Sequence, residues 1–172
     1  MDKGIFLSKI EYMMKKLIDG QVILTAIDED KGATGMTVAW GFFGNMWNEP
    51  FFIAAVRPYR YTINAIHEAG TFSVNFFDDG HQDALNYFGS VSGYDEDKFA
   101  KGLIHYSVTK DRYAVIDEAK IVLNCRIITT NQIEAFHLDS AYIRKHYQQD
   151  NGYHAMIYGR IDEMMIRDHL KV

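Results

Sequence analysis

Short runs of apolar and β-branched residues recur along this 172-residue chain, and most connections between them are short. Parallel neighbours need a long crossover, so these runs should pair mainly as antiparallel strands. We expect about six to eight strands and two to four helices in a single domain, residues 1–172. Closing the strands into a barrel removes exposed sheet edges and leaves helices at its ends. The runs span residues 21–27, 36–41, 51–56, 71–76, 121–129, 153–158 and 161–166.

Two segments have clear helix signals. Ser8 and Glu11 form a capping box at the start of an amphipathic stretch that Gly20 ends. A second helix is expected over residues 60–69, because Gly70 follows as a C-terminal stop.

Charge and composition exclude several classes of protein. The formal net charge is −5 and no Lys/Arg cluster is longer than a pair, so the basic patch of a nucleic-acid binder is missing. Cys125 is the single cysteine and lies in an apolar run, which indicates a buried small hydrophobe and a reducing compartment. No apolar run reaches about 18 residues and no cleavable leader is evident, so we expect a cytoplasmic protein without a membrane partner.

Familiar catalytic signatures are missing from the sequence. It has no P-loop, no Gly-x-Gly-x-x-Gly and no His-Glu-x-x-His motif, and its seven histidines are scattered. Residues 89–93 do not form a nucleophile elbow, because Val91 occupies the place of the serine. We therefore expect neither a catalytic triad nor a metal site.

An anion-binding cradle is one interpretation of the segment after the third apolar run. Arg57 and Arg60 lie three residues apart, beside Thr62 and close to the expected helix start. Guanidinium groups, a hydroxyl and free backbone N–H groups all favour phosphate. The alternative is that both arginines are solvated charges at the end of a strand.

Five separated blocks stand out along the sequence: Met-Thr-Val-Ala-Trp-Gly (36–41), Trp-Asn-x-Pro (47–50), Val-Arg-Pro-x-Arg-Tyr-Thr (56–62), Phe-Ser-Val-Asn-Phe-Phe (72–77) and Ser-Gly-x-Asp-x-Asp-Lys-Phe (92–99). Together they resemble the flavin reductase-like split-barrel family, in its flavoredoxin-type branch. The resemblance is close over residues 21–103 and loose elsewhere. It is specific because all five blocks agree in order and spacing.

The resemblance implies a mainly β (α+β) fold, a six-stranded antiparallel split barrel with flanking helices. It also implies a homodimer with FMN at or near the subunit interface. The strand that would lie along the isoalloxazine ring and ribityl chain contains Thr37, Val38, Ala39 and Trp40. The turn that would meet the phosphate and ring edge contains Arg57, Tyr59, Arg60, Tyr61 and Thr62. A further block beside the phosphate contains Ser92 and Lys98.

The chain departs from the family pattern at three positions. Ala39 replaces a common Ser, which removes a hydroxyl donor. Tyr94 replaces a common Arg, so one possible phosphate cation is lost, and Arg160 stands where Glu is frequent. These departures leave Arg57 and Arg60 untouched.

Several of the candidate residues also have a purely structural interpretation. Trp40 could be a core or interface aromatic, and packing is the preferred interpretation of Trp47. Tyr59 and Tyr61 could be surface residues at a barrel end. Lys98 could be a solvated charge in a short helix over 95–101. Three further aromatic residues are expected in the core: Phe72, Phe76 and Phe77.

Three functions are compatible with these observations. The first is an NAD(P)H-dependent flavin oxidoreductase, in which hydride passes from nicotinamide to flavin and the protein orients the rings and places positive charge nearby. The second is a flavoredoxin-like carrier that holds FMN and exchanges electrons with a redox protein partner without nicotinamide. The third is a flavin-free binding module on the same barrel.

Overall fold

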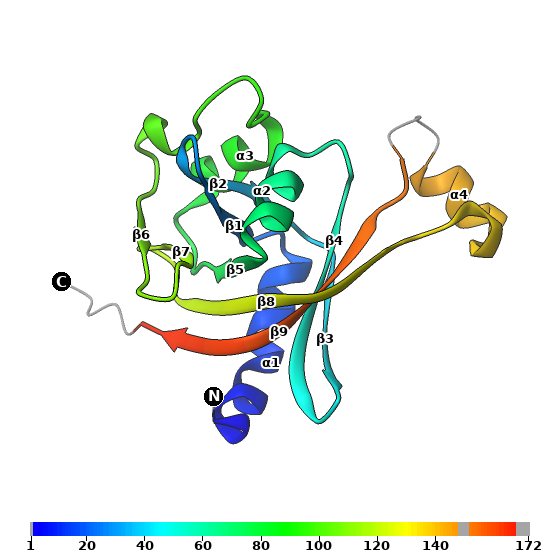
Figure 1. The fold of residues 1–172 in the computed structure, drawn as a ribbon, viewed down its shortest axis with the longest axis horizontal. Coiled ribbons are helices and arrows are strands. Elements are labelled where there is room, and N and C mark those ends of the chain that lie inside the picture. Colours follow the sequence, from blue (N-terminus) through cyan, green and yellow to red (C-terminus); the bar gives the residue numbers. More distant parts are fainter. Residues whose placement is uncertain (1, 148–151, 168–172) are drawn as a thin grey trace.

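A computed structural model describes residues 2–147 and 152–167 and places most strands in one antiparallel sheet (Figure 1). The sheet has seven strands in the order β2-β1-β5-β8-β9-β4-β3, and β6 and β7 form a separate two-stranded ladder. The strands are β1 (Val22–Asp28), β2 (Gly32–Thr37), β3 (Gly41–Met46), β4 (Glu49–Val56), β5 (Thr71–Phe76), β6 (Tyr106–Val108), β7 (Ala114–Ile116), β8 (Ile121–Gln132) and β9 (Ala155–Ile166). The helices are α1 (Lys3–Ile18), α2 (Tyr61–Ala69), α3 (Gln82–Ser90) and α4 (Ser140–His146), with 3-10 turns at Phe99–Lys101 and Ala135–His137.

The sheet closes through residues 38–40, which connect the strands at the two ends of its strand order, β2 and β3. Val38 donates its N–H to the carbonyl of Val22 in β1 at 2.9 Å. Two residues later, the carbonyl of Trp40 accepts the N–H of Ala55 in β4 at 3.2 Å. This crossing segment therefore bonds first to one half of the sheet and then to the other. The predicted mainly β, antiparallel split barrel is confirmed, with seven strands in its sheet rather than six.

Phenylalanine rings fill the barrel. Phe52, Phe72 and Phe76 are at most 1% exposed and pack in one cluster, while Phe77 lies in a second cluster with α3. The prediction that Phe72, Phe76 and Phe77 are core residues is confirmed. Burying such a ring contributes about 1.5–3 kcal/mol. Gly159 of β9 is needed for this packing, because a Cβ there would lie 2.5 Å from Cζ of Phe72.

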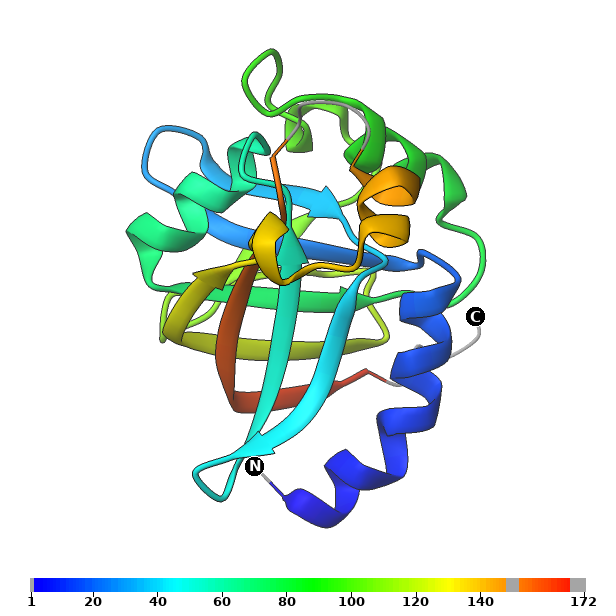
Figure 2. The ribbon, with the colours of Figure 1, turned by 90° about the vertical axis from the view of Figure 1, so that its right-hand side faces the viewer.

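Helix α1 begins earlier than the sequence predicts. Asp2 is its N-cap, and the carboxylate accepts the N–H groups of Gly4 and Ile5. Ser8, expected as the cap, lies inside the helix and donates to the carbonyl of Ile5. The earlier cap prevails because its carboxylate satisfies two N–H groups of the first turn. Figure 2 shows α1 along the side of the barrel, and no helix in the described ranges is long and apolar enough to cross a membrane.

Strand β2 of the first hairpin begins earlier in the chain than the sequence pattern indicates. A strand over 36–41 was expected, but β2 ends at Thr37 and the next strand begins only at Gly41. The pairing of β1 with β2 starts at Asp28 and Gly32. Small and polar residues such as Thr34 resemble a loop in sequence, yet the ladder to β1 orders them as strand.

The C-terminal strand is also continuous where two strands were expected. Gly159 and Arg160 have the appearance of a turn between the runs 153–158 and 161–166, but they pair with Phe52 and Phe51 of β4. Tertiary pairing therefore overrides the local signal.

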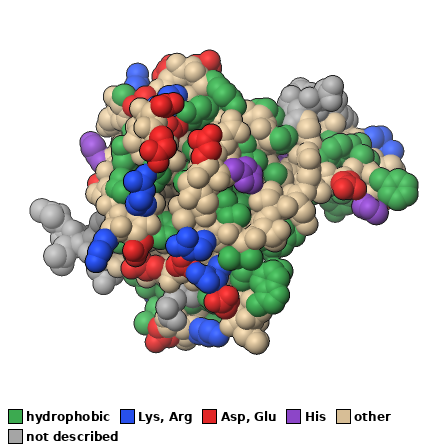
Figure 3. Space-filling view, viewed as in Figure 1, with side chains coloured by type: hydrophobic (Ala, Val, Ile, Leu, Met, Phe, Trp, Pro, Cys, Tyr) green, Lys and Arg blue, Asp and Glu red, His purple; other side chains and the backbone are tan. Residues whose placement is uncertain are grey.

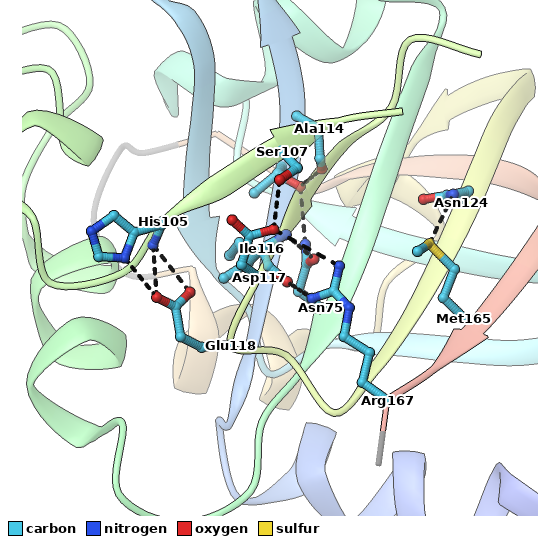
Figure 4. Close-up of polar contacts among 11 residues, drawn as sticks. Asn75, His105, Ser107, Ala114, Ile116, Asp117, Glu118, Asn124, Met165 and Arg167 are labelled. Atoms are coloured by element: carbon cyan, nitrogen blue, oxygen red, sulfur yellow. Dashed lines mark hydrogen bonds and ion pairs between the residues drawn. The ribbon is translucent and has the colours of Figure 1, made fainter. Parts of the chain in front are cut away.

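A buried amide attaches the small β6–β7 ladder to the main sheet (Figure 4). Asn75 of β5 donates to Thr25 at 2.9 Å, and its side-chain oxygen accepts the N–H of Ile116 in β7 at 2.8 Å. Thr25 in turn donates to the carbonyl of Ala114. Nearby, Arg167 donates to the carbonyl of Ile116. These bonds satisfy polar groups that would be costly to bury unpaired.

The connection between β8 and β9 protrudes from the barrel and includes α4 (Figure 1). The space-filling view shows hydrophobic, basic and histidine side chains on this protrusion (Figure 3). Phe136 is 92% exposed and Tyr142 is 62% exposed. At the base of the protrusion Gln132 pairs with Ala155, and the preceding residue, His154, lines the candidate functional site described below.

Candidate functional site

A hollow of about 220 Å³ lies where the crossing segment 38–40 meets the turn that follows β4. The crossing segment supplies one wall and the turn supplies two arginines. The lining residues are Met36, Thr37, Val38, Ala39, Trp40, Ala55, Arg57, Tyr59, Arg60, Gly89 and His154. We call this the first hollow.

A second hollow of about 160 Å³ adjoins the first, because Tyr59 and Arg60 line both. Its other walls come from the start of α2 and from the loop that follows α3. The lining residues are Tyr59, Arg60, Tyr61, Thr62, Ser90, Val91, Ser92, Gly93 and Lys98. All eleven residues proposed from the sequence as flavin-binding therefore lie around these two adjoining hollows.

The start of α2 leaves backbone donors available at the second hollow. Pro58 lies in a tight turn in which the N–H of Arg60 bonds to the carbonyl of Arg57 at 3.1 Å. Arg60 is the N-cap of α2, and no side chain caps the helix. The N–H of Ile63 bonds back to the carbonyl of Arg60 at 3.1 Å, so the N–H groups of Tyr61 and Thr62 are the first-turn donors left to attract an anion. Thr62, one residue into the helix, is buried.

Two cations converge at the end of α3, beside the second hollow. Arg60 donates from both terminal nitrogens to the carbonyl of Gly89 at 3.0 Å. Lys98 is only 4% exposed, and its ammonium donates to the carbonyls of Gly35 and Phe88 at 2.9 and 3.0 Å. Burial, and then the nearby charge of Arg60, lower the pKa of Lys98 to about 8.

The interpretation of Lys98 as a solvated charge is therefore wrong. The helix expected over 95–101 is also reduced to the 3-10 turn Phe99–Lys101. The carboxylate of Asp97 accepts the N–H of Phe99 at 3.0 Å and competes with helical bonding.

Arg57 lies at the first hollow and is absent from the lining of the second. Its guanidinium donates to the carbonyl of His146 at 2.9 Å and to that of Gly152 at 3.0 Å. It also lies 4.9 Å from the centre of the Tyr147 ring. Arg57 thus connects the end of β4 to the protrusion.

An aromatic wall closes one side of the first hollow. Trp40 is 43% exposed, and its ring centroid lies 4.5 Å from that of His154 and 5.7 Å from that of His146. The Nδ1 atom of His154 lies 2.9 Å from the hydroxyl of Tyr147. Burial, and then the charge of Arg57, lower the pKa of His154 to about 4, so the imidazole is neutral at pH 7.

His154 is the titratable lining residue that was not proposed from the sequence; the other lining residues not proposed are Met36, Ala55, Gly89, Ser90, Val91 and Gly93. His154 is one of seven scattered histidines and has no spacing partner. The available signal was its place at the start of an apolar run, beside the loop that returns from the protrusion.

The two tyrosines of the β4–α2 turn differ in their environment. Tyr59 is 51% exposed at the junction of the hollows. The hydroxyl of Tyr61 donates to the carboxylate of Asp28 at 2.7 Å, and this bond, followed by burial, raises the pKa of Tyr61 to about 12. Trp47 lies outside both hollows, 65% exposed in the turn between β3 and β4, with its ring beside that of Phe51.

The three departures from the family pattern have separate outcomes. Ala39 lines the first hollow, where its methyl group supplies no hydroxyl. Tyr94 packs the edge of its ring against Tyr61, with centroids 4.9 Å apart. Arg160 lines neither hollow and instead pairs with Asp162 at 2.7 Å.

Comparison with protein families agrees with this geometry. The model of the flavin reductase like domain matches residues 14–172. The chain belongs to the flavin reductase-like family. As a member of that family it is a flavin-binding redox protein, and the two adjoining hollows are its candidate flavin site. Comparison with curated proteins finds no match.

Solved structures of this family share the fold. Flavoredoxin from Methanosarcina acetivorans is 25% identical, with a TM-score of 0.69 over 88% of this chain and 70% of that one. An FMN-binding protein from Thermus thermophilus is 18% identical, with a TM-score of 0.66 over 88% and 74% of the two chains. The flavin reductase of styrene monooxygenase from Pseudomonas putida S12 is 14% identical, with a TM-score of 0.63 over 86% and 79%.

Proposed function

We propose that this chain binds FMN and passes electrons from NAD(P)H through the flavin to an acceptor. The observation that supports the proposal is the pair of adjoining hollows, which differ in chemistry. Trp40 and the crossing segment border the first hollow, Arg60 lines both hollows where they adjoin, and Lys98 lines the second. FMN likewise has a flat apolar ring at one end and a phosphate dianion at the other.

The donors of the second hollow fit a phosphate. Lys98 uses two of its three N–H bonds on protein carbonyls and has one left for a ligand. Thr62 and Ser92 add hydroxyls, and the uncapped start of α2 adds backbone N–H groups. Charge-assisted bonds of this kind are among the stronger hydrogen bonds in proteins.

The walls of the first hollow would hold the ring system. Val38 and Ala39 present short side chains, and Trp40 adds a large aromatic face. A bound flavin would supply the hydride acceptor. Arg57 and Arg60 place positive charge at the hollow, which favours a reduced, anionic flavin, whereas His154 adds no charge at neutral pH.

Anaerobic mixing tests this function directly. The FMN-loaded protein is mixed with NADH, and separately with NADPH, while the flavin absorbance at about 450 nm is followed. Rapid bleaching with either nucleotide is the expected result. Persistence of the yellow colour with both would contradict nicotinamide-dependent reduction.

The second candidate is an FMN-containing electron carrier that serves a redox protein partner. Two observations favour it: the sequence lacks a dinucleotide fingerprint, and the flavoredoxin from Methanosarcina acetivorans is 25% identical. Its expected result in the same experiment is a stable yellow colour with nicotinamide and bleaching by a chemical reductant.

We also propose that the chain forms a homodimer. An apolar hollow of about 300 Å³ shares Ala39, Trp40 and Ala55 with the first hollow, so a partner seated there would lie beside the flavin site. Phe42 and Ile18 at this surface are 55% and 72% exposed. Light scattering after gel filtration should give twice the mass of the chain, and the mass of a single chain would contradict the dimer.

A further inference from the structure

The outer end of the second hollow is closed by contact between its two walls. Gly93, in the loop after α3, packs directly against the ring of Tyr61 at the start of α2. A Cβ on Gly93 would lie 2.7 Å from Cδ1 of Tyr61, which leaves no space between them. This contact therefore bounds one side of the hollow.

Residues at the turn between β1 and β2 bind both Gly93 and Tyr61 and stabilise this contact. The ammonium of Lys31 donates to the carbonyl of Gly93 and lies 4.4 Å from the centre of the Tyr61 ring. Asp28, at the end of β1, accepts the hydroxyl of Tyr61 at 2.7 Å. One short turn thus holds both sides of the closure in place.

Tyr94 adds a second brace. Its ring meets the Tyr61 ring edge-on, with centroids 4.9 Å apart. Asn64 of α2 donates to the Tyr94 hydroxyl at 2.9 Å and fixes that ring over the closure. Neither Lys31 nor Tyr94 lines the hollow itself, so both act through Tyr61 and Gly93.

We propose that this closure selects FMN over FAD. We call Asp28, Lys31, Tyr61, Gly93 and Tyr94 the end-stop. The inference rests on the proposed function, because it assumes that a flavin phosphate occupies the second hollow. FMN ends at a phosphate monoester, whereas FAD continues through a pyrophosphate to adenosine and needs an exit at this point.

The charge of the phosphate also favours FMN over FAD, as the closure does. The terminal phosphate of FMN is close to a dianion at pH 7, whereas the flavin-side phosphate of FAD has one ester bond and one anhydride bond and keeps one negative charge. Arg60 and Lys98 at the hollow favour the dianion. The end-stop and the two cations therefore both discriminate against FAD.

The test compares the affinities of FMN, FAD and riboflavin, measured by calorimetry. The wild-type protein should bind FMN at least about tenfold more tightly than FAD. In Lys31→Ala/Tyr94→Ala the FMN-to-FAD ratio should fall by about fivefold or more while FMN affinity changes less than about threefold. Lys31→Met, which keeps the aliphatic contact but not the bond to Gly93, should give an intermediate ratio.

The control is Val108→Ala/Lys110→Ala, which removes two exposed side chains that line neither hollow and should leave the ratio unchanged. Equal binding of FMN and FAD by the wild type, or an unchanged ratio in both end-stop variants, would overturn the end-stop but leave flavin binding intact. Failure to bind any flavin would instead overturn the proposed function itself.

Discussion

The affinity for FMN should depend on pH through the charge of Lys98. The ammonium is buried, and its pKa is lowered to about 8 by burial and by Arg60. A phosphate dianion in the second hollow would favour the charged form of Lys98. Binding should therefore be strongest where the free protein already holds that proton, and it should weaken as the pH rises.

The size of this effect follows from the pKa. With a pKa of about 8, Lys98 is about nine-tenths charged at pH 7 and about one-tenth charged at pH 9. If only the charged form pairs with the phosphate, the dissociation constant rises about tenfold over this range, or about 1.4 kcal/mol. The second pKa of a phosphate monoester is about 6, so the phosphate of FMN is mainly a dianion over this whole pH range.

The measurement is a flavin fluorescence titration at pH 7, 8 and 9. Lys98→Met should bind FMN more weakly at pH 7 and show a nearly flat profile. Lys101→Met, which removes an exposed lysine three residues away, should keep the slope of the wild type. A flat profile in the wild-type protein, or an unchanged slope in Lys98→Met, would refute the pairing of Lys98 with the phosphate.

Three further predictions concern single side chains. Arg60→Ala should weaken FMN binding by about 1.5–3 kcal/mol in the same titration, since a charge-assisted bond is lost; unchanged affinity would remove Arg60 from the phosphate site. Gly159→Ala should lower the free energy of unfolding in urea by about 1–3 kcal/mol, because its Cβ would lie 2.5 Å from the Phe72 ring, and unchanged stability would show that the ring can move. Asp2→Ala should cost about 1 kcal/mol by loss of the α1 cap, whereas Ser8→Ala should cost less; the reverse order would contradict the observed helix start.

The sequence predicts the architecture because short connections and apolar periodicity are local signals. Helix α2 and its stop at Gly70, which adopts a left-handed φ of 66°, match the prediction, as does strand β5 at Thr71–Phe76. The sequence does not predict the early part of β2 or the continuity of β9. Both depend on which strand lies alongside, as the pairing of Gly159 with Phe52 shows.

In the candidate site, too, contacts between residues far apart in the chain could not be predicted. The residues of the candidate flavin site could be proposed because five ordered blocks resemble a family, and the structure brings all eleven to two adjoining hollows. The partners of the charged groups could not be predicted. Arg57 bonds to the carbonyls of His146 and Gly152, about ninety residues later in the chain, and the sequence contains no mark of that contact. Lys98 likewise appears polar in sequence but is buried by tertiary packing.

The crossing segment 38–40 bonds to both halves of the sheet through backbone atoms, the N–H of Val38 and the carbonyl of Trp40. The side chain of Val38 is buried in the core, whereas those of Ala39 and Trp40 are exposed and line the first hollow. Substitution at Ala39 or Trp40 can therefore change the surface offered to a ligand while the two hydrogen bonds and the core contact of Val38 are kept. The segment thus divides its side chains between holding the barrel together and facing the site.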